Sequence, residues 1–325
     1  MMFSTIIGHE RPLSILTRAL ANNTLAHAYI FSGQAGIGKK LTAFALAAAV
    51  NCRKAGPGTG CGECPSCRRI ASGGHPDVHL VESGGEEIKI DRIRELQSDL
   101  ALKPFEGAKK ILIIDGAEDM NVASANAFLK TLEEPPGDAL IILVTSMPQG
   151  LLPTIRSRCQ EIRFLPLSRQ TLAHALIERR GLSEEDAWLL AALAQGSMGR
   201  GMEMDLEQEK AAREEAALLW TGLAQTSPVE LLSRAEALAK DREGLERMID
   251  MGIEQLRDTL VLRETGDDRL LVNVRGKNLY GQKAAQLPLQ RMFLDMDLLT
   301  GSRVLLDRRV SAQLVVENLF MKLGR

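Results

Sequence analysis

A glycine-rich stretch near the start of the chain constrains its fold more than any other segment: Phe31-Ser32-Gly33-Gln34-Ala35-Gly36-Ile37-Gly38-Lys39-Lys40. It has the Gly-x-x-x-x-Gly-Lys frame of a phosphate-binding P-loop, in which backbone N–H groups surround a phosphate and the lysine neutralises it. An apolar run precedes the stretch and an alanine-rich segment follows it, which is the strand–loop–helix context that the motif requires. The alternative, a chance glycine-rich turn, would not require a strand before it and a helix after it. The candidate nucleotide-binding residues here are Gly33, Gly36, Gly38 and Lys39.

The residue after the P-loop lysine departs from the motif. Active P-loop enzymes carry Ser or Thr at that position, and its hydroxyl holds Mg²⁺. This chain has Lys40 instead, which offers no hydroxyl and adds a second positive charge. The loop can still hold phosphate, but it has lost its usual magnesium ligand.

A second buried strand supports the same fold. The run Ile111-Leu112-Ile113-Ile114-Asp115 is typical of a Walker B strand, whose terminal acid lies at the edge where open α/β sheets bind ligands. Active ATPases carry Glu directly after this Asp, but Gly116 follows here, and Glu118 is expected at the surface. A further strand at 139–145 ends in Thr145, which is placed to sense a phosphate. Two parts needed for phosphoryl transfer are therefore missing.

Four cysteines follow the P-loop helix with the spacing Cys-x8-Cys-x2-Cys-x2-Cys: Cys52, Cys61, Cys64 and Cys67. The segment between them is rich in glycine and has too few apolar residues to fold unaided. Four thiolates at short spacing are the ligand set of a structural zinc site, which supplies folding free energy. An iron–sulfur cluster and unligated thiols are the alternatives. Arg53 and Arg69 flank the cysteines and are expected in a solvated charged rim or, alternatively, on nucleic acid.

Composition limits the wider classes. The chain has 325 residues, a net charge of −2 and 45% hydrophobic residues, which fits a globular protein of two or three domains without a global basic surface for nucleic acid. No stretch reaches the roughly 18 apolar residues of a membrane helix, and no signal peptide begins the sequence. We therefore expect a cytoplasmic protein, in which cysteines favour metal or free thiol over disulfides.

After residue 165 the pattern becomes helical. Ser227-Pro228-Val229-Glu230 has the form of a capping box with proline at the first helical position. An apolar stripe at helical spacing begins at Leu245, and a short extended piece is expected at 270–274. We predict three domains: an α/β domain at 1–165 with a zinc module at 52–67, an all-α domain at 166–207, and an all-α domain at 208–325.

Several motifs then identify a family. The following segments occur in one order: Leu25-Ala26-His27-Ala28-Tyr29-Ile30-Phe31, the P-loop, the four cysteines, His75-Pro76-Asp77, Asn126-Ala127-Phe128-Leu129-Lys130-Thr131-Leu132-Glu133-Glu134-Pro135-Pro136 and Ser157-Arg158-Cys159. Together they resemble the delta-prime subunits of the bacterial DNA polymerase III clamp loader, which are AAA+ proteins. The resemblance is dense over residues 5–165 and weakens beyond them. The defective P-loop separates delta-prime from the gamma/tau motor subunits.

The resemblance implies a RecA-like AAA+ domain, a helical lid and a helical collar. It implies a stator-like subunit in a ring with gamma/tau and delta subunits, which opens the beta sliding clamp and places it on primed DNA in the replisome. Cys52, Cys61, Cys64 and Cys67 match the family's zinc module. Arg158 matches an arginine finger offered in trans to a neighbour's ATP. In the lid segment Gly196–Arg200, the position of a phosphate-sensing arginine falls on Gly199.

Three hypotheses follow. The first is a non-hydrolysing clamp-loader subunit that binds ATP weakly or not at all, within the DNA polymerase III holoenzyme. The second is an autonomous AAA+ ATPase of the gamma/tau type, whose turnover Lys39→Ala would abolish. The third is a zinc-dependent nucleic-acid-binding module with salt-sensitive DNA binding. The near-neutral charge and the missing hydroxyl favour the first.

Overall fold

The structure is a computed structural model that describes residues 2–54 and 59–324, so residues 55–58 of the predicted zinc module lie outside it. The chain divides into two compact units. The first comprises Met1–Arg180 and Ala194–Met202, and the second comprises Gly181–Leu193 and Glu203–Arg325. The three domain boundaries drawn from the sequence stay a prediction.

The first unit is built on a five-stranded parallel sheet with the order β2-β3-β4-β1-β5. The strands are β1 (Ala28–Ser32), β2 (Val78–Glu82), β3 (Lys110–Asp115), β4 (Ala139–Thr145) and β5 (Gln160–Arg163). The predicted strand at 139–145 is confirmed, as is Asp115 at the end of its strand. This sheet confirms the predicted α/β class with a parallel sheet.

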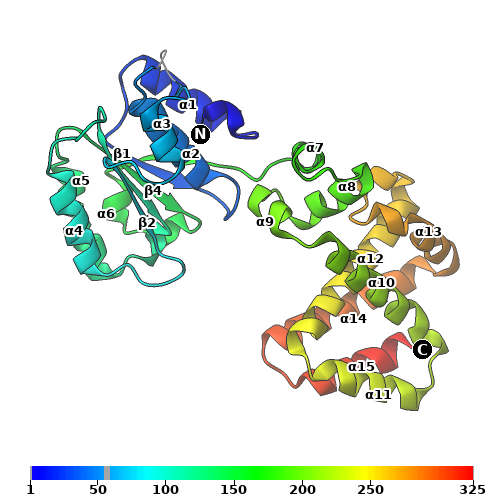
Figure 1. Cartoon of the computed structure of the whole chain (residues 1–325). Helices are drawn as coiled ribbons and strands as arrows, with labels where there is room; N and C mark the ends of the chain where they lie inside the picture. The colour runs from blue at the N-terminus through cyan, green and yellow to red at the C-terminus, as the bar shows by residue number, and fades with distance from the viewer. Residues whose placement is uncertain (1, 55–58, 325) are drawn as a thin grey trace. The chain divides into compact units, whose positions relative to one another are not determined.

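Helices cover both faces of the sheet (Figure 1). Alternate side chains enter opposite cores: Ile111 and Ile113 face one, whereas Leu112 and Ile114 face the other. The interior strands β1, β3 and β4 read as nearly continuous apolar runs because both of their faces are buried. The first face is covered by α1 (Glu10–Ala21), α2 (Lys39–Val50) and α3 (Pro65–Ala71), and the second by α4 (Ile90–Leu100), α5 (Val122–Glu133) and α6 (Pro153–Arg156).

All regular structure described after β5 is helical, as predicted. The α-helices are α7 (Arg169–Arg180), α8 (Glu184–Leu193), α9 (Met198–Glu203), α10 (Leu206–Gly222), α11 (Pro228–Ala239), α12 (Arg242–Thr265), α13 (Lys277–Gln286), α14 (Leu289–Asp307) and α15 (Ala312–Leu323). Short 3₁₀ turns are η1 (Phe3–Thr5), η2 (Ala117–Asp119), η3 (Pro148–Gly150), η4 (Leu223–Gln225), η5 (Asp268–Leu270) and η6 (Val274–Gly276). The core of the second unit lies among α11, α12, α14 and α15.

Two local predictions in the second unit had different outcomes. Ser227 does cap α11, because its hydroxyl accepts a hydrogen bond from the Glu230 amide at 3.4 Å. The extended piece expected at 270–274 is not a strand: η5 ends at Leu270 and η6 begins at Val274, and between them Leu271 has extended backbone angles (φ −71°, ψ 144°). The carboxylate of buried Asp258 accepts hydrogen bonds from the amides of Val272 and Asn273, each at 2.9 Å, and fixes the connection between the two turns.

No helix in the described part of the chain combines the length and the apolar character that a membrane crossing requires.

Candidate nucleotide and metal sites

The P-loop connects β1 to α2 as the sequence predicts. Gly33, Gly36 and Gly38 have φ angles of 145°, 73° and 107°, which other residues rarely adopt. A Cβ at Gly33 would lie 2.4 Å from the carbonyl oxygen of Phe164, so this glycine is also required by close packing. The loop therefore has the backbone shape that turns amide groups toward a phosphate.

The loop amides are available for an anion. Among the described residues, no hydrogen bond is recorded from the backbone N–H groups of residues 34–36 and 38–40. The ammonium of Lys39 instead donates to the carbonyls of Gly33 and Gln34, at 2.6 and 2.7 Å. Burial lowers the pKa of Lys39, and the nearby carboxylates of Asp115 and Glu118 partly offset this effect. The donor set fits a phosphate group, which would give the Lys39 charge a stronger partner than its own loop.

Lys40 occupies the position of the usual magnesium-binding hydroxyl. Its ammonium forms ion pairs with Glu82, at the end of β2, and with Asp115 Oδ2 at 3.4 Å, at the end of β3. Those two acids face each other across the β2–β3 register. The predicted Walker B carboxylate is thus brought into the site, but it already carries a cation from its own chain.

Thr145 and Glu118 complete this edge of the sheet. Thr145 is buried at the end of β4, where its hydroxyl accepts from the Met147 amide at 3.0 Å and its carbonyl accepts from the Gly33 amide. Glu118 is half-buried rather than exposed, and its Oε1 accepts from the amide and hydroxyl of Ser146 at 2.8 and 2.7 Å. Burial would raise the pKa of Glu118, but the hydrogen bonds from Ser146 outweigh it and lower that pKa.

Sequence reasoning missed Glu118 because it does not directly follow the Walker B aspartate. Gly116 has a φ of 79° and begins the η2 turn, which returns the chain toward the end of β4. A glycine directly after a buried strand was the available signal, since it permits a reversal within three residues.

The lid segment closes over the P-loop backbone. Ser197 donates its hydroxyl to the Ala35 carbonyl at 3.0 Å, and the Gly199 amide donates to the Gly36 carbonyl at 2.8 Å. A Cβ at Gly199 would lie 3.1 Å from Gly36 Cα, and a Cβ at Gly36 would lie 2.4 Å from Ser197 Oγ, so both glycines favour this close approach.

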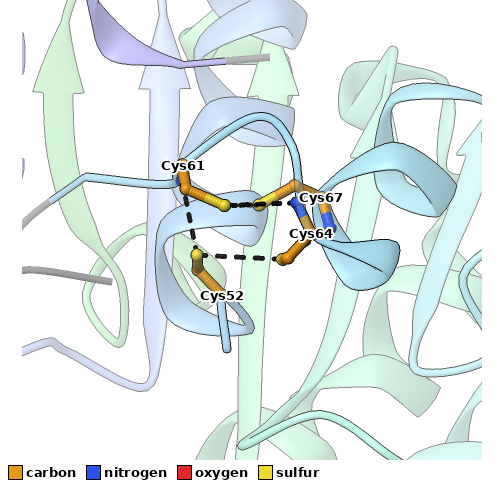
Figure 2. A group of neighbouring side chains, drawn as sticks. All are labelled: Cys52, Cys61, Cys64 and Cys67. Atoms are coloured by element: carbon orange, nitrogen blue, oxygen red, sulfur yellow. Dashed lines mark hydrogen bonds between the residues drawn. The ribbon is translucent and has the colours of Figure 1, made fainter. Parts of the chain in front are cut away.

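The four predicted cysteines converge on one point (Figure 2). All four sulfur atoms lie within 4.8 Å of one another, with Cys52 and Cys64 separated by 3.9 Å and Cys61 and Cys67 by 4.0 Å. These distances exclude disulfides. They match the edge of about 3.8 Å that a tetrahedron has when its zinc–sulfur bonds are about 2.3 Å. The donor set therefore fits a single tetrahedral ion better than a wider iron–sulfur cluster.

Backbone amides prepare three of these sulfurs for a cation, whereas burial raises the pKa of the fourth thiol, Cys67, to about 12. The amides of Cys61, Cys64 and Cys67 donate to the sulfurs of Cys52, Cys61 and Cys64. Burial would raise the pKa of Cys64, but hydrogen bonds from the amides of Cys67 and Arg53 lower it to about 6. Thiolates are the form that binds metal. The fifth thiol, Cys159, lies outside the cluster, and burial raises its pKa to about 12.

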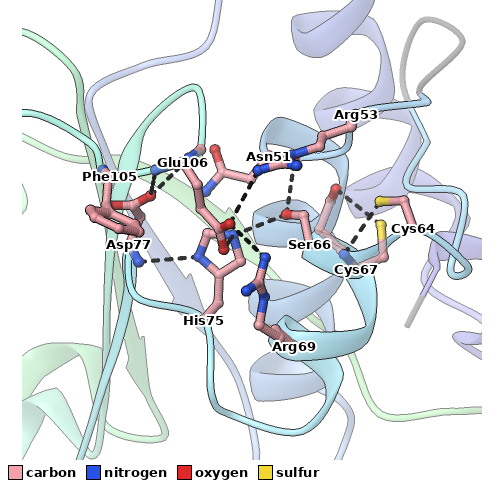
Figure 3. Close-up of polar contacts among 12 residues, drawn as sticks. Asn51, Arg53, Cys64, Ser66, Cys67, Arg69, His75, Asp77, Phe105 and Glu106 are labelled. Carbon is pink, nitrogen blue, oxygen red and sulfur yellow. Dashed lines mark hydrogen bonds and ion pairs between the residues drawn. The ribbon is translucent and has the colours of Figure 1, made fainter.

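A buried polar network joins the cysteine cluster to the sheet (Figure 3). Ser66 donates to the Asn51 carbonyl at 2.8 Å and lies 3.0 Å from Nε2 of His75. The Asp77 amide donates to Nδ1 of His75, so the ring proton is on Nε2 and points to Ser66. The Asp77 carboxylate accepts three amides, from Phe105, Glu106 and Gly107, at 2.6–2.9 Å. A serine, a histidine and an aspartate thus lie together, but they do not form a catalytic triad. The ring nitrogen that faces Ser66 carries the proton of the imidazole and cannot accept one from the serine.

The basic residues around the cysteines are neutralised within this network. Glu106 Oε2 pairs with Arg53 at 3.1 Å and with Arg69 at 2.5 Å. The Glu106 side chain is 11% exposed, whereas both guanidinium groups are about half exposed. Two of the arginines that could have formed a nucleic-acid patch therefore share one buried carboxylate.

Arg158 lies between α6 and β5. Its Nη2 forms an ion pair with Glu133 Oε1 at 2.7 Å, and its Nη1 donates to the Thr154 carbonyl at 2.9 Å. Its side chain is 36% exposed, so the guanidinium is held in place but remains reachable. Glu133 is the first acid of the Leu-Glu-Glu-Pro-Pro segment at the end of α5.

Comparison with known proteins places these features in context. The family described as "DNA polymerase III, delta subunit" matches residues 8–168. A DNA polymerase III subunit delta' of Bacillus subtilis is 34% identical over 265 residues, which are 80% of each chain. A subunit delta' of Pseudomonas aeruginosa is 40% identical over 178 residues, about half of each chain. A subunit tau of Bacillus subtilis is 29% identical over 324 residues, 92% of this chain and 57% of that protein.

Proposed function

The chain belongs to the family of DNA polymerase III delta-prime subunits, and on that premise we propose that it is a stator-like subunit of the clamp loader. In this role it completes a neighbour's ATPase site and hydrolyses no ATP itself. Its partners would be the gamma/tau and delta subunits, and through them the beta sliding clamp and primed DNA. The place of action would be the replisome in the cytoplasm.

The absence of self-hydrolysis is supported by three positions around the P-loop. Lys40 replaces the magnesium-binding hydroxyl and pairs with Asp115. Gly116 stands where an active ATPase carries its water-orienting glutamate. Gly199 replaces the sensing arginine of the lid and packs on Gly36. Each loss removes a different contribution to phosphoryl transfer, so restoring one residue alone would not restore turnover.

The alternative is an autonomous ATPase of the gamma/tau type. The match to a tau subunit along most of this chain supports this alternative. It requires steady ATP turnover by the purified chain, abolished by Lys39→Ala. The observations around Lys40, Gly116 and Gly199 favour the stator.

The single observation that carries the proposal is the position of Arg158. A guanidinium that reaches a neighbour's γ-phosphate stabilises the charge of the transition state, and such fingers contribute about 10³–10⁵ in rate. Arg158 is immobilised by Glu133 and Thr154 yet remains partly exposed. If the guanidinium of Arg158 moved to a neighbour's γ-phosphate, it would leave the carboxylate of Glu133 for a more highly charged anion.

The test is single-turnover ATP hydrolysis by the reconstituted loader with clamp and primed DNA. We expect Arg158→Ala to remove one site's share of the fast phase while the complex still assembles, as measured by size-exclusion chromatography. Arg158→Lys should not restore that share, because lysine lacks the planar fork. Arg156→Ala is the matched control, since this exposed arginine lies two residues earlier. A full fast phase in the Arg158→Ala loader would contradict the proposed finger.

The cysteine cluster has a structural role in this proposal. Zn²⁺ held by Cys52, Cys61, Cys64 and Cys67 would fix the loop after α2 against α3 and so stabilise the first unit. A zinc-dependent DNA-binding function is less well supported, because Arg53 and Arg69 already share Glu106.

A further inference from the structure

The ammonium of Lys40 lies where a P-loop enzyme would hold its metal. It contacts the carboxylates that end β2 and β3, Glu82 and Asp115, and the second of these is the Walker B acid. In an active site that acid acts on Mg²⁺ beside the P-loop. Here the ammonium of Lys40, a residue of α2, forms an ion pair with that carboxylate instead.

Apart from one carboxylate oxygen, the other groups at this edge offer Mg²⁺ no replacement ligand. The next hydroxyl along α2, that of Thr42, is fully buried and donates to the Gly38 carbonyl at 2.9 Å. Gly116 provides no side chain, and Glu118 has its Oε1 engaged by Ser146, so that only its buried Oε2 is without a hydrogen-bond partner among the described residues. Mg²⁺ needs near-octahedral oxygen ligands, and at Asp115 it would also meet the positive charge of Lys40. The residues present do not fit the ion.

The same site nevertheless retains the donors for an anion. The amides of residues 34–36 and 38–40 make no recorded hydrogen bond in the described part of the chain, and Lys39 lies 6% exposed beside them. Lys39 brings a positive charge to the start of α2, where the helix dipole adds to it, and Lys40 offsets the negative charges of Glu82 and Asp115 beside the loop. A polyphosphate without a metal would meet these donors at its full negative charge.

We propose that this P-loop binds the metal-free polyphosphate of a nucleotide, with the ammonium of Lys40 serving as a built-in substitute for Mg²⁺. The inference rests on the proposed non-hydrolysing site and names the ligand form that the site selects. It also says what the replacement of the hydroxyl by Lys40 achieves. The loop still binds the polyphosphate, but the Mg²⁺ needed for hydrolysis is excluded. The nucleotide then stabilises the loop and lid without being consumed.

Calorimetric titration of the purified full-length chain with ATP tests this selection. Magnesium is removed by passing the buffers over a chelating resin, because a soluble chelator could also strip the cysteine cluster. We expect ATP to bind in the magnesium-free buffer and at least about 10-fold more weakly when MgCl₂ is in excess, because the complexed phosphate has lost much of its charge. Inorganic tripolyphosphate should show the same magnesium dependence, which separates phosphate recognition from base recognition.

Substitutions at Lys40 give the decisive comparison. Lys40→Thr should reverse the preference, so that ATP binds more tightly with Mg²⁺ than without it. Lys40→Arg keeps the charge and should behave as the unmodified chain, and it also controls for lost ion pairs if Lys40→Thr is unstable. Lys103→Thr removes one exposed lysine elsewhere in the same unit and should change neither affinity by more than about twofold.

Two results would overturn the proposal: no ATP binding in either buffer, or binding by the unmodified chain that requires Mg²⁺. Neither result bears on the finger, because loss of the fast phase in the Arg158→Ala loader is measured on a different subunit's nucleotide. Conversely, a full fast phase in that loader would leave the magnesium preference of this P-loop intact.

Discussion

At the scale of single residues, the buried histidine beside the cysteine cluster shows how one side chain ties several segments together. His75 is 3% exposed, and both of its ring nitrogens are engaged, one by Ser66 and the other by the Asp77 amide. Burial lowers the pKa of His75, and the nearby Glu106 and Asp77 only partly offset it. The ring is therefore neutral in the folded chain at a pH where a free histidine begins to take up a proton.

This lowered pKa predicts acid sensitivity. Below about pH 6.5 the unfolded chain binds a proton at His75 before the folded chain does, so stability falls as pH decreases through that window. The slope can reach about 1.4 kcal/mol per pH unit. We expect His75→Gln to flatten this part of the stability curve, measured by urea unfolding between pH 7 and pH 5. His79, whose pKa burial also lowers, would keep a residual slope.

The exposed His174 provides the control for this experiment. His174→Gln should leave the slope unchanged, and metal loss at low pH should affect all three chains alike. If His75→Gln retained the full slope of the unmodified chain, the neutral buried ring would not be the cause.

Individual site residues differed in how well the sequence predicted them. The P-loop glycines and the four cysteines were predictable because each depends on local chain geometry or on close spacing of one residue type. The structure does bring Gly33, Lys39, Asp115 and Thr145 to one edge of the sheet. Ser66 and Glu118 were not predictable, since their roles arise from partners at His75 and Ser146 that are distant along the chain.

At the scale of elements, the connection from β1 to α2 depends on a glycine that no other residue can replace without strain. Gly33 combines a φ of 145° with a packing position against Phe164. We expect Gly33→Ala to lower the free energy of unfolding of the first unit by about 1–3 kcal/mol, measured by urea unfolding. Gly137→Ala is the matched control, because a Cβ there would meet no atom within 4 Å. Equal stability of the two variants would contradict this account.

The strands were predicted better than the connections between helices. β3 and β4 are apolar runs with clear boundaries, and their burial on both faces leaves few alternatives. The segment at 270–274 has a similar local pattern but no neighbouring strand in the described structure. Its amides bind to Asp258 on α12 instead, a tertiary interaction that no local pattern reveals.

At the scale of the whole molecule, each compact unit has its own hydrophobic core, so we expect two unfolding transitions. Both tryptophans of the chain, Trp188 and Trp220, belong to the second unit, whereas the cysteine cluster belongs to the first. Tryptophan fluorescence should therefore follow the second unit alone, whereas far-ultraviolet circular dichroism, to which the helices of both units contribute, should show both transitions.

Metal removal should shift only one of these transitions. We expect chelation or Cys64→Ser to lower the midpoint of the first unit by several degrees in circular dichroism, while the fluorescence midpoint stays within about 1 °C. Cys159→Ser is the control, since this thiol lies in the same unit but outside the cluster. Metal analysis should give one zinc per chain for the unmodified protein and for Cys159→Ser. A cysteine cluster without metal in freshly purified protein would contradict this prediction.

The interior position of β1, between β4 and β5, has a consequence for folding during synthesis. β1 is made first, yet its partners are β4 and β5, so that Ala28 pairs with Ile141 and Tyr29 with Gln160. Such long-range parallel pairing is intrinsically slow, and unpaired apolar strands are prone to aggregation. The cysteine cluster needs only the chain up to Cys67. Metal binding could therefore tether the nascent segment after α2 well before the ribosome has delivered the strands that bury β1.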